Sequence, residues 1–285
     1  MAILSFWSAS KKETGQTLSL VAIATYMSVE HNYKTLVIDA TLDDDTIERC
    51  FWNKKTNIDN LEARNNLNRG KLDIASGTEG LMSAIASNKT TPEIISNYTK
   101  VVFKNRLDIL LGLKTSSFEL HEKNLMMYNE LIAAANKYYD LVIVDLPKTY
   151  ERESVHNILQ KSDVVMYTMS QNLKQIDEYI YNKNTIPELK RKNTIPIIGS
   201  VNEFSKYNLK NIANYIKEKE TVGILYNNGF MEAASEAKIS EFFLKTRLDK
   251  KAWDRNYNFF ESVVNSSKKV MNKFEEIKYG KIMNS

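Results

Sequence analysis

The sequence is poor in the residues that interrupt or cross-link a chain. Its 285 residues include one cysteine, four prolines and nine glycines. The single Cys50 excludes an intramolecular disulfide, fits a reducing compartment, and is better explained as a small buried side chain than as a nucleophile. Internal repeats and low-complexity linkers are also lacking. We therefore expect residues 1–285 to form a single continuous domain.

Long hydrophobic runs and a strong charge imbalance are lacking too. No apolar run is as long as the roughly 18 residues that a membrane-spanning helix needs. The first residues also lack the basic segment followed by a long apolar segment that is typical of a secretory signal. The net charge of +4, from 39 basic and 35 acidic side chains, is too small to require nucleic acid as a partner. We expect a cytoplasmic protein without a membrane span.

The stretch from residue 3 to residue 18 has the pattern of a phosphate-binding loop. An apolar run, Ile3–Trp7, is followed by a polar loop, Ser8–Thr17, and then by an apolar-periodic helix to about Glu30. Strand, polar loop and helix is the setting that such a loop needs. Against the pattern G-x-x-x-x-G-K-[ST], the fixed positions hold Ser10, Gly15, Gln16 and Thr17. The loop alone leaves open an ordinary strand–helix turn.

Further apolar runs alternate with helical patterns and predict a doubly wound α/β fold. The mostly parallel sheet, with helices on both faces, places its ligand site at the carboxyl edge. The strands are expected at Lys34–Asp39, Leu107–Gly112, Leu141–Asp145, Asp163–Met169, Ile195–Asn202 and Thr221–Tyr226. The clearest helices are expected at Gly80–Ala86, from Pro92 onward after a Thr91 cap, at Asn124–Tyr139, and at about 252–278 as an amphipathic C-terminal helix.

Acidic residues occur at three points of interest. Leu141–Val144 followed by Asp145 has the form of a Walker B strand, whose Asp holds Mg²⁺; a buried strand ending in a turn-forming Asp is the alternative. Asp39 ends another strand at the same edge, so Thr17, Asp39 and Asp145 are the candidate metal ligands. Residues 43–72 are polar and are expected to be irregular, with Asp43–Asp45 as a solvated turn rather than a metal site.

These parts, in this order, resemble the ParA/MinD family of P-loop ATPases over nearly the whole chain. The family loop reads K-G-G-x-G-K-T, and Lys11–Thr17 keeps three of its positions, Lys11, Gly15 and Thr17. The resemblance implies ATP or ADP with Mg²⁺, and Lys11 as the signature lysine. It implies that the base is read by Asn202 and covered by the loop at Tyr226 and Asn227. The implied nucleotide contacts are Lys11, Lys12, Glu13, Thr14, Gly15, Gln16, Thr17, Leu18, Asn202, Tyr226 and Asn227.

Three departures from the family pattern predict at most a weak ATPase. Gln16 stands where the family has a lysine that reaches the phosphates, so a charge-assisted contact is lost. Glu13 replaces a glycine and brings a carboxylate near an anion site. Thr41 stands at the position of the water-orienting Asp, and a hydroxyl is a poor substitute for a carboxylate.

Three functions follow from the resemblance. The first is a degenerate positioning or scaffold factor. Around Ser205–Tyr207 and Glu241–Leu244 the chain is most similar to the TadZ/CpaE group. That similarity implies Flp/Tad pilus-assembly or secretion proteins as partners, and recruitment to a pole or to a membrane-associated machine. The second is an ATP-dependent switch that forms a homodimer. The third, less favoured, is a partition ATPase that binds non-specific DNA. Its candidate basic cluster is Lys245, Arg247, Lys250, Lys251 and Arg255.

Overall fold

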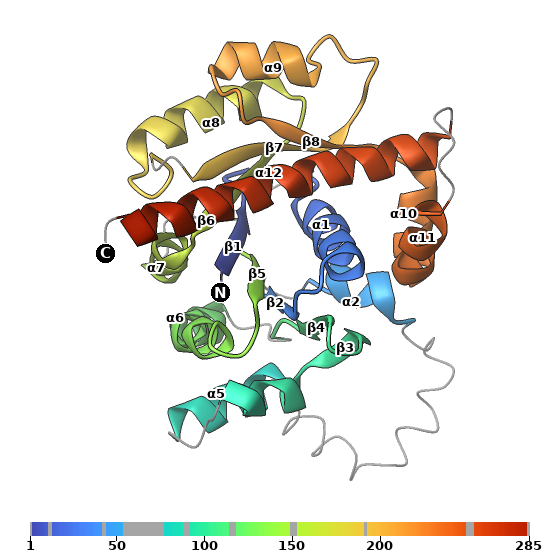
Figure 1. Cartoon of the computed structure of the whole chain (residues 1–285). Coiled ribbons are helices and arrows are strands. Elements are labelled where there is room, and N and C mark those ends of the chain that lie inside the picture. The colour runs from blue at the N-terminus through green and yellow to red at the C-terminus, as the bar shows by residue number, and fades with distance from the viewer. Residues whose placement is uncertain are drawn as a thin grey trace.

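One eight-stranded sheet runs through the computed structural model (Figure 1). The structure describes residues 2–10, 13–41, 44–53, 77–87, 92–113, 118–148, 153–190, 193–248 and 254–283. The sheet order is β3-β4-β2-β5-β1-β6-β7-β8, and every neighbouring pair is parallel except β3 with β4. The strands are β1 (Ala2–Trp7), β2 (Thr35–Asp39), β3 (Lys100–Phe103), β4 (Leu107–Leu110), β5 (Leu141–Asp145), β6 (Val164–Met169), β7 (Thr194–Val201) and β8 (Val222–Leu225).

Helices cover both faces of this sheet and enclose two hydrophobic cores. One face carries α1 (Gln16–Glu30), α2 (Thr46–Phe51), α10 (Asn228–Ser235), α11 (Ile239–Thr246) and α12 (Arg255–Met283). The other carries α5 (Thr78–Ala86), the 3₁₀ helix η1 (Pro92–Tyr98), α6 (Phe118–Ala135), α7 (Glu153–Lys161), α8 (Leu173–Thr185) and α9 (Leu209–Ile216). Alternation along β1 feeds both cores, because Leu4 and Phe6 face α1 while Ile3 and Trp7 face the opposite layer.

The doubly wound, mostly parallel sheet predicted from the sequence is confirmed, and two elements correct the details. The irregular region predicted from residue 43 contains α2, where the Asp44 carboxylate accepts the Thr46 N–H at 2.8 Å and Ile47 and Cys50 are buried. The edge strand β3 was not predicted; its first residues are exposed, so it lacks a continuous apolar pattern. Residues 54–76, Asp43 and Thr91 lie outside the described residues.

The C-terminal helix α12 supplies hydrogen bonds to the edge strand β8. The Ser262 hydroxyl accepts the Leu225 N–H at 3.1 Å, and the Ser266 hydroxyl donates to the Gly223 carbonyl at 3.4 Å. An edge strand otherwise presents unpaired backbone groups that invite pairing with another chain. Spacing of four residues puts both serines on one face of α12, so the helix covers this edge.

Within the described ranges, no helix has the length and apolarity needed to cross a membrane.

We predict that Ser262→Ala lowers the free energy of unfolding by about 1–3 kcal/mol, because the Leu225 N–H loses its acceptor in a partly buried place. The matched control is Ser267→Ala on the same helix. The Ser267 hydroxyl is buried and has no hydrogen-bond partner among the described residues, so its removal is expected to be neutral or stabilising. Urea unfolding of both variants makes the comparison; equal losses would show that the serine contacts to β8 are unimportant.

Candidate functional site at the carboxyl edge of the sheet

The loop between β1 and α1 lies against the end of β7. Gly15 adopts a left-handed conformation with φ 69°, and Glu13, exposed, does so with φ 47°. A Cβ atom on Gly199 would lie 2.2 Å from the Thr14 carbonyl oxygen, so only glycine allows this approach. The loop therefore has a left-handed backbone conformation at both Glu13 and Gly15, although Glu13 carries a large side chain.

The side chain of Gln16 points into the protein toward the end of β5. Its amide nitrogen donates to Asp145 Oδ1 at 2.6 Å and to the Leu146 carbonyl at 2.8 Å. The neighbouring Thr17 hydroxyl donates to Asp145 Oδ2 at 2.7 Å. Gln16 and Asp145 are both buried, and each carboxylate oxygen of Asp145 thus receives a hydrogen bond from an uncharged donor.

Asp39 lies directly beside Asp145, because the two residues are in register on the parallel strands β2 and β5. Thr41 donates its hydroxyl and its N–H to Asp39 Oδ1, at 2.6 and 3.0 Å. Burial, and then the charge of Asp145, raise the pKa of the Asp39 carboxyl to about 7, although the Thr41 hydrogen bonds lower it. Burial also raises the pKa of Asp145 to about 6, against the lowering by Gln16 and Thr17.

The same atoms form an oxygen-rich donor set. It comprises the carboxylates of Asp39 and Asp145, the Thr17 hydroxyl, and Gln16 Oε1, which is buried without a hydrogen-bond partner in the described part of the chain. Oxygen ligands of this kind suit Mg²⁺. In the described ranges no three His, Cys, Asp or Glu side chains gather as a metal cluster, so a metal here would rest on these two carboxylates and on neutral oxygens. The residues therefore fit Mg²⁺, provided that Gln16 and Thr17 give up their bonds to Asp145.

The residues predicted to hold the base end of a nucleotide lie next to this loop. Leu18, Ser200, Tyr226 and Asn227 line one small cavity of about 10 Å³. The side chain of Asn227 is already engaged there: Oδ1 accepts the Phe230 N–H at 2.7 Å and caps α10, and Nδ2 donates to Asn256 at 3.0 Å. Its contact with a base stays a prediction, as does that of Tyr226, whose side chain is 56% exposed.

Asn202 is positioned by a residue that the sequence analysis missed, Gln171. The Gln171 amide donates to the carbonyls of Asn202 and Tyr207, at 3.1 and 2.8 Å, and its oxygen accepts the Asn202 N–H at 2.7 Å. The Asn202 side chain in turn accepts the Phe204 N–H at 3.0 Å. Gln171 lies two residues after the end of β6, and nothing in its sequence neighbourhood indicates this role.

The structure does not describe every predicted residue. Lys11 and Lys12 of the loop, and Lys250 and Lys251 of the basic cluster, lie outside the described residues. Of the rest of that cluster, Arg247 forms an ion pair with Glu30 at 3.1 Å. One of the basic side chains proposed to contact DNA is therefore already paired with a carboxylate.

Comparison with known proteins places the fold. No protein-family model and no curated sequence matches the chain. A ParA family ATPase from Chlorobium tepidum TLS superposes with a TM-score of 0.68 and 15% identity, over 93% of this chain and 97% of that one. The fold is that of the ParA/MinD ATPases.

Two further structures of this fold contain nucleotide. A putative plasmid partition protein from Borrelia burgdorferi B31 bound to AMPPNP has a TM-score of 0.60 and 17% identity, over 95% of this chain and 99% of that one. The septum site-determining protein MinD from Pyrococcus horikoshii OT3, complexed with Mg-ADP, has a TM-score of 0.63 and 13% identity, over 92% and 94%. At these identities the ParA/MinD likeness of this chain is one of fold.

We predict that Gly199→Ala destabilises the protein by roughly 1–3 kcal/mol, because the added methyl group would force the Thr14 backbone away from β7. The control is Gly280→Ala, where the added methyl group meets no atom within 4 Å. Since Gly280 lies within α12, alanine there is expected to stabilise the helix by up to about 1 kcal/mol. Urea midpoints of the two variants decide; a Gly199→Ala protein as stable as Gly280→Ala would contradict the close loop contact.

The raised pKa values of Asp39 and Asp145 predict a pH-dependent stability. An unfolded Asp has a pKa near 3.9, so the folded chain binds these protons more tightly. The contribution of the pair is complete below about pH 4 and is lost as the pH rises through about 6 and then 7. In EDTA, the loss of stability between pH 5 and pH 7.5 is expected to be roughly 2 kcal/mol smaller for Asp39→Asn than for the natural protein. Asp177→Asn, at an exposed position, is the control; a loss of equal size in Asp39→Asn and the natural protein would refute the shift.

Proposed function

We propose that this chain is a ParA/MinD-like positioning or scaffold factor that binds ATP–Mg²⁺ weakly and hydrolyses it at close to the uncatalysed rate. The observation that carries the proposal is the side chain of Gln16. It occupies the position of the phosphate-binding lysine, it carries no charge, and it is bonded to Asp145 and to the Leu146 carbonyl. A residue held in this way does not present a cation to a phosphate.

The energetic argument has two parts. A charge-assisted hydrogen bond contributes roughly 1.5–3 kcal/mol, which corresponds to about ten- to a hundredfold in affinity or rate. Gln16 lacks this contribution. In addition, a metal at Asp145 has to replace hydrogen bonds that Gln16 and Thr17 already make to both carboxylate oxygens. Both carboxylate oxygens of Asp145 are therefore already hydrogen-bonded within the chain, and this disfavours tight binding.

The remaining residues would hold a nucleotide without activating it. Thr17, Asp39 and Asp145 are the ligands proposed for Mg²⁺, which when bound would neutralise phosphate charge. The Thr41 hydroxyl is bonded to Asp39 Oδ1, so the residue at the water-orienting position is occupied with a neighbouring carboxylate. A protein of this kind would act through its surface and its partners.

The finer proposal is a role like that of the TadZ/CpaE group. We infer a homodimer that marks a position for a pilus-assembly or secretion machine, recruited there by other proteins. Support comes from the sequence similarity around Ser205–Tyr207 and Glu241–Leu244, and from the fold shared with positioning and partition ATPases. The partition alternative predicts a salt-sensitive shift of non-specific duplex DNA.

Calorimetry and turnover measurements test the role of Gln16. Gln16→Lys is expected to tighten ATP–Mg²⁺ binding by about ten- to a hundredfold, because it restores the missing cation. Turnover is expected to rise only when Thr41→Asp is added, since the lysine alone does not orient water. Asn272→Lys, at an exposed position on α12, adds the same charge away from the loop and is the control. The proposal fails if the natural protein already hydrolyses ATP as fast as the double variant.

A further inference from the structure

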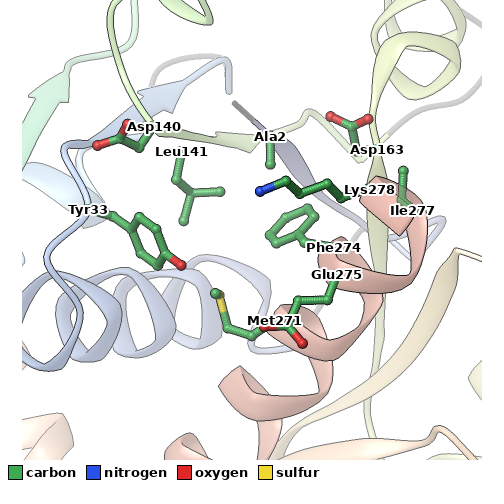
Figure 2. A pocket seen from close by; sticks show the side chains of 10 residues that line it. All are labelled: Ala2, Tyr33, Asp140, Leu141, Asp163, Met271, Phe274, Glu275, Ile277 and Lys278. Carbon is green, nitrogen blue, oxygen red and sulfur yellow. The ribbon is translucent and has the colours of Figure 1, made fainter. Parts of the chain in front are cut away.

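A second cavity lies at the amino edge of the sheet, at the opposite end of β1 from the phosphate loop. Ala2 and Leu141, the first residues of β1 and β5, form part of its wall, and the C-terminal half of α12 forms the other side (Figure 2). Its volume is about 420 Å³. Small-molecule sites commonly have about 300–1,000 Å³. The cavity is thus large enough for a ligand and separate from the site described above.

Much of the cavity lining is apolar, and the helix α12 does not fully cover it from solvent. Met271, Phe274 and Ile277 recur at a spacing of three along α12, so they share one side of the helix. All three pack against the hydrophobic core but stay partly exposed. Leu141 continues this apolar surface on the sheet side. A ligand that fills the cavity would therefore bury apolar surface that the fold leaves in contact with water.

Two of the polar side chains that line the cavity accept hydrogen bonds from backbone N–H groups. The Asp140 carboxylate accepts the Lys34 N–H at 2.9 Å, and the Asp163 carboxylate accepts the Ile3 N–H at 3.0 Å. In Figure 2 both carboxylates turn away from the middle of the cavity. These two residues hold the backbone at the cavity rim.

Lys278, Glu275 and the Tyr33 hydroxyl also line the cavity. Within the described ranges, Lys278 and Glu275 have no ion-pair partner and Tyr33 Oη has no hydrogen bond. The Lys278 ammonium extends toward the middle of the cavity, and the Tyr33 hydroxyl points the same way (Figure 2). Two exposed side chains of opposite charge, Glu275 and Lys278, which form no ion pair within the described ranges, thus stand at one largely apolar cavity.

We propose that this cavity binds a small apolar zwitterion, of the class of aromatic or long aliphatic α-amino acids. Its carboxylate would accept hydrogen bonds from Lys278 and Tyr33, its ammonium group would pair with Glu275, and its side chain would pack on Leu141 and Phe274.

Charge decides between this ligand and simpler ones. An apolar anion would find Lys278 but would also meet the negative charge of Glu275. An apolar cation would find the Glu275 carboxylate but would meet the Lys278 ammonium, which extends toward the middle of the cavity. A zwitterion pairs with both signs, and this difference in pairing provides specificity.

Three probes with the same ring separate these cases: L-phenylalanine, 2-phenylethylamine and 3-phenylpropionate. Each is titrated into the full chain labelled with ¹³C at the methionine methyl groups, and the Met271 signal reports the cavity. L-phenylalanine is expected to bind about tenfold more tightly than either of the others, since each of these lacks one ion pair. An unmoved Met271 signal, or equal affinity for all three probes, overturns the proposal.

Two neutralising variants assign the contacts. Glu275→Gln is expected to weaken binding of L-phenylalanine and of the amine by about threefold or more, without weakening binding of the acid. Lys278→Gln is expected to weaken binding of L-phenylalanine and of the acid, without weakening binding of the amine. Both residues are exposed on α12, so the variants are expected to fold. The controls are Glu232→Gln and Lys268→Gln, exposed residues that do not line the cavity; equal effects in variants and controls would refute the assignment.

Discussion

The buried carboxylate of Asp145 connects the parts of this structure that form the candidate site. It ends the strand at the centre of the sheet, next to β1 and β2, and it receives hydrogen bonds from the first two residues of α1. A buried carboxylate without partners would be costly, and the two donors offset that cost. These hydrogen bonds hold the loop, the helix α1 and the strand β5 in one arrangement.

This arrangement has a consequence for nucleotide chemistry. A lysine at the position of Gln16 would bring a positive charge to two adjacent carboxylates and to a phosphate. The Gln16 amide instead donates a hydrogen bond to Asp145, and its own oxygen has no partner among the described residues. Burial raises the pKa values of Asp39 and Asp145, and the hydrogen bonds from the uncharged donors Thr41, Gln16 and Thr17 lower them only in part. The fold of the ParA/MinD ATPases is thus kept with an uncharged side chain at position 16.

The long helix α12 contacts two different parts of the sheet, the edge strand β8 and the amino ends of the central strands β1 and β5. Near its start, Ser262 and Ser266 bond to the outer edge of β8. Near its end, Met271, Phe274 and Ile277 stand over a cavity instead of closing it. The first half of α12 packs closely against β8, whereas the second half leaves a cavity between itself and the sheet. This cavity has room for a ligand far from the phosphate loop.

The sequence by itself determined the architecture and the identity of the candidate site. Apolar runs ending in Asp39 and Asp145, alternating with helical patterns, predict a parallel sheet, because only that topology brings both strand ends to one edge. Local patterns were insufficient for β3, which is exposed, and for α2, which is shorter than two turns. What Gln16 does was decided only by the tertiary structure: the sequence shows that a lysine is missing, but the bonds to Asp145 and Leu146 join residues about 130 positions apart. The same holds for Gln171, and for the cavity under α12, because contacts between distant segments leave no periodic signal in the sequence.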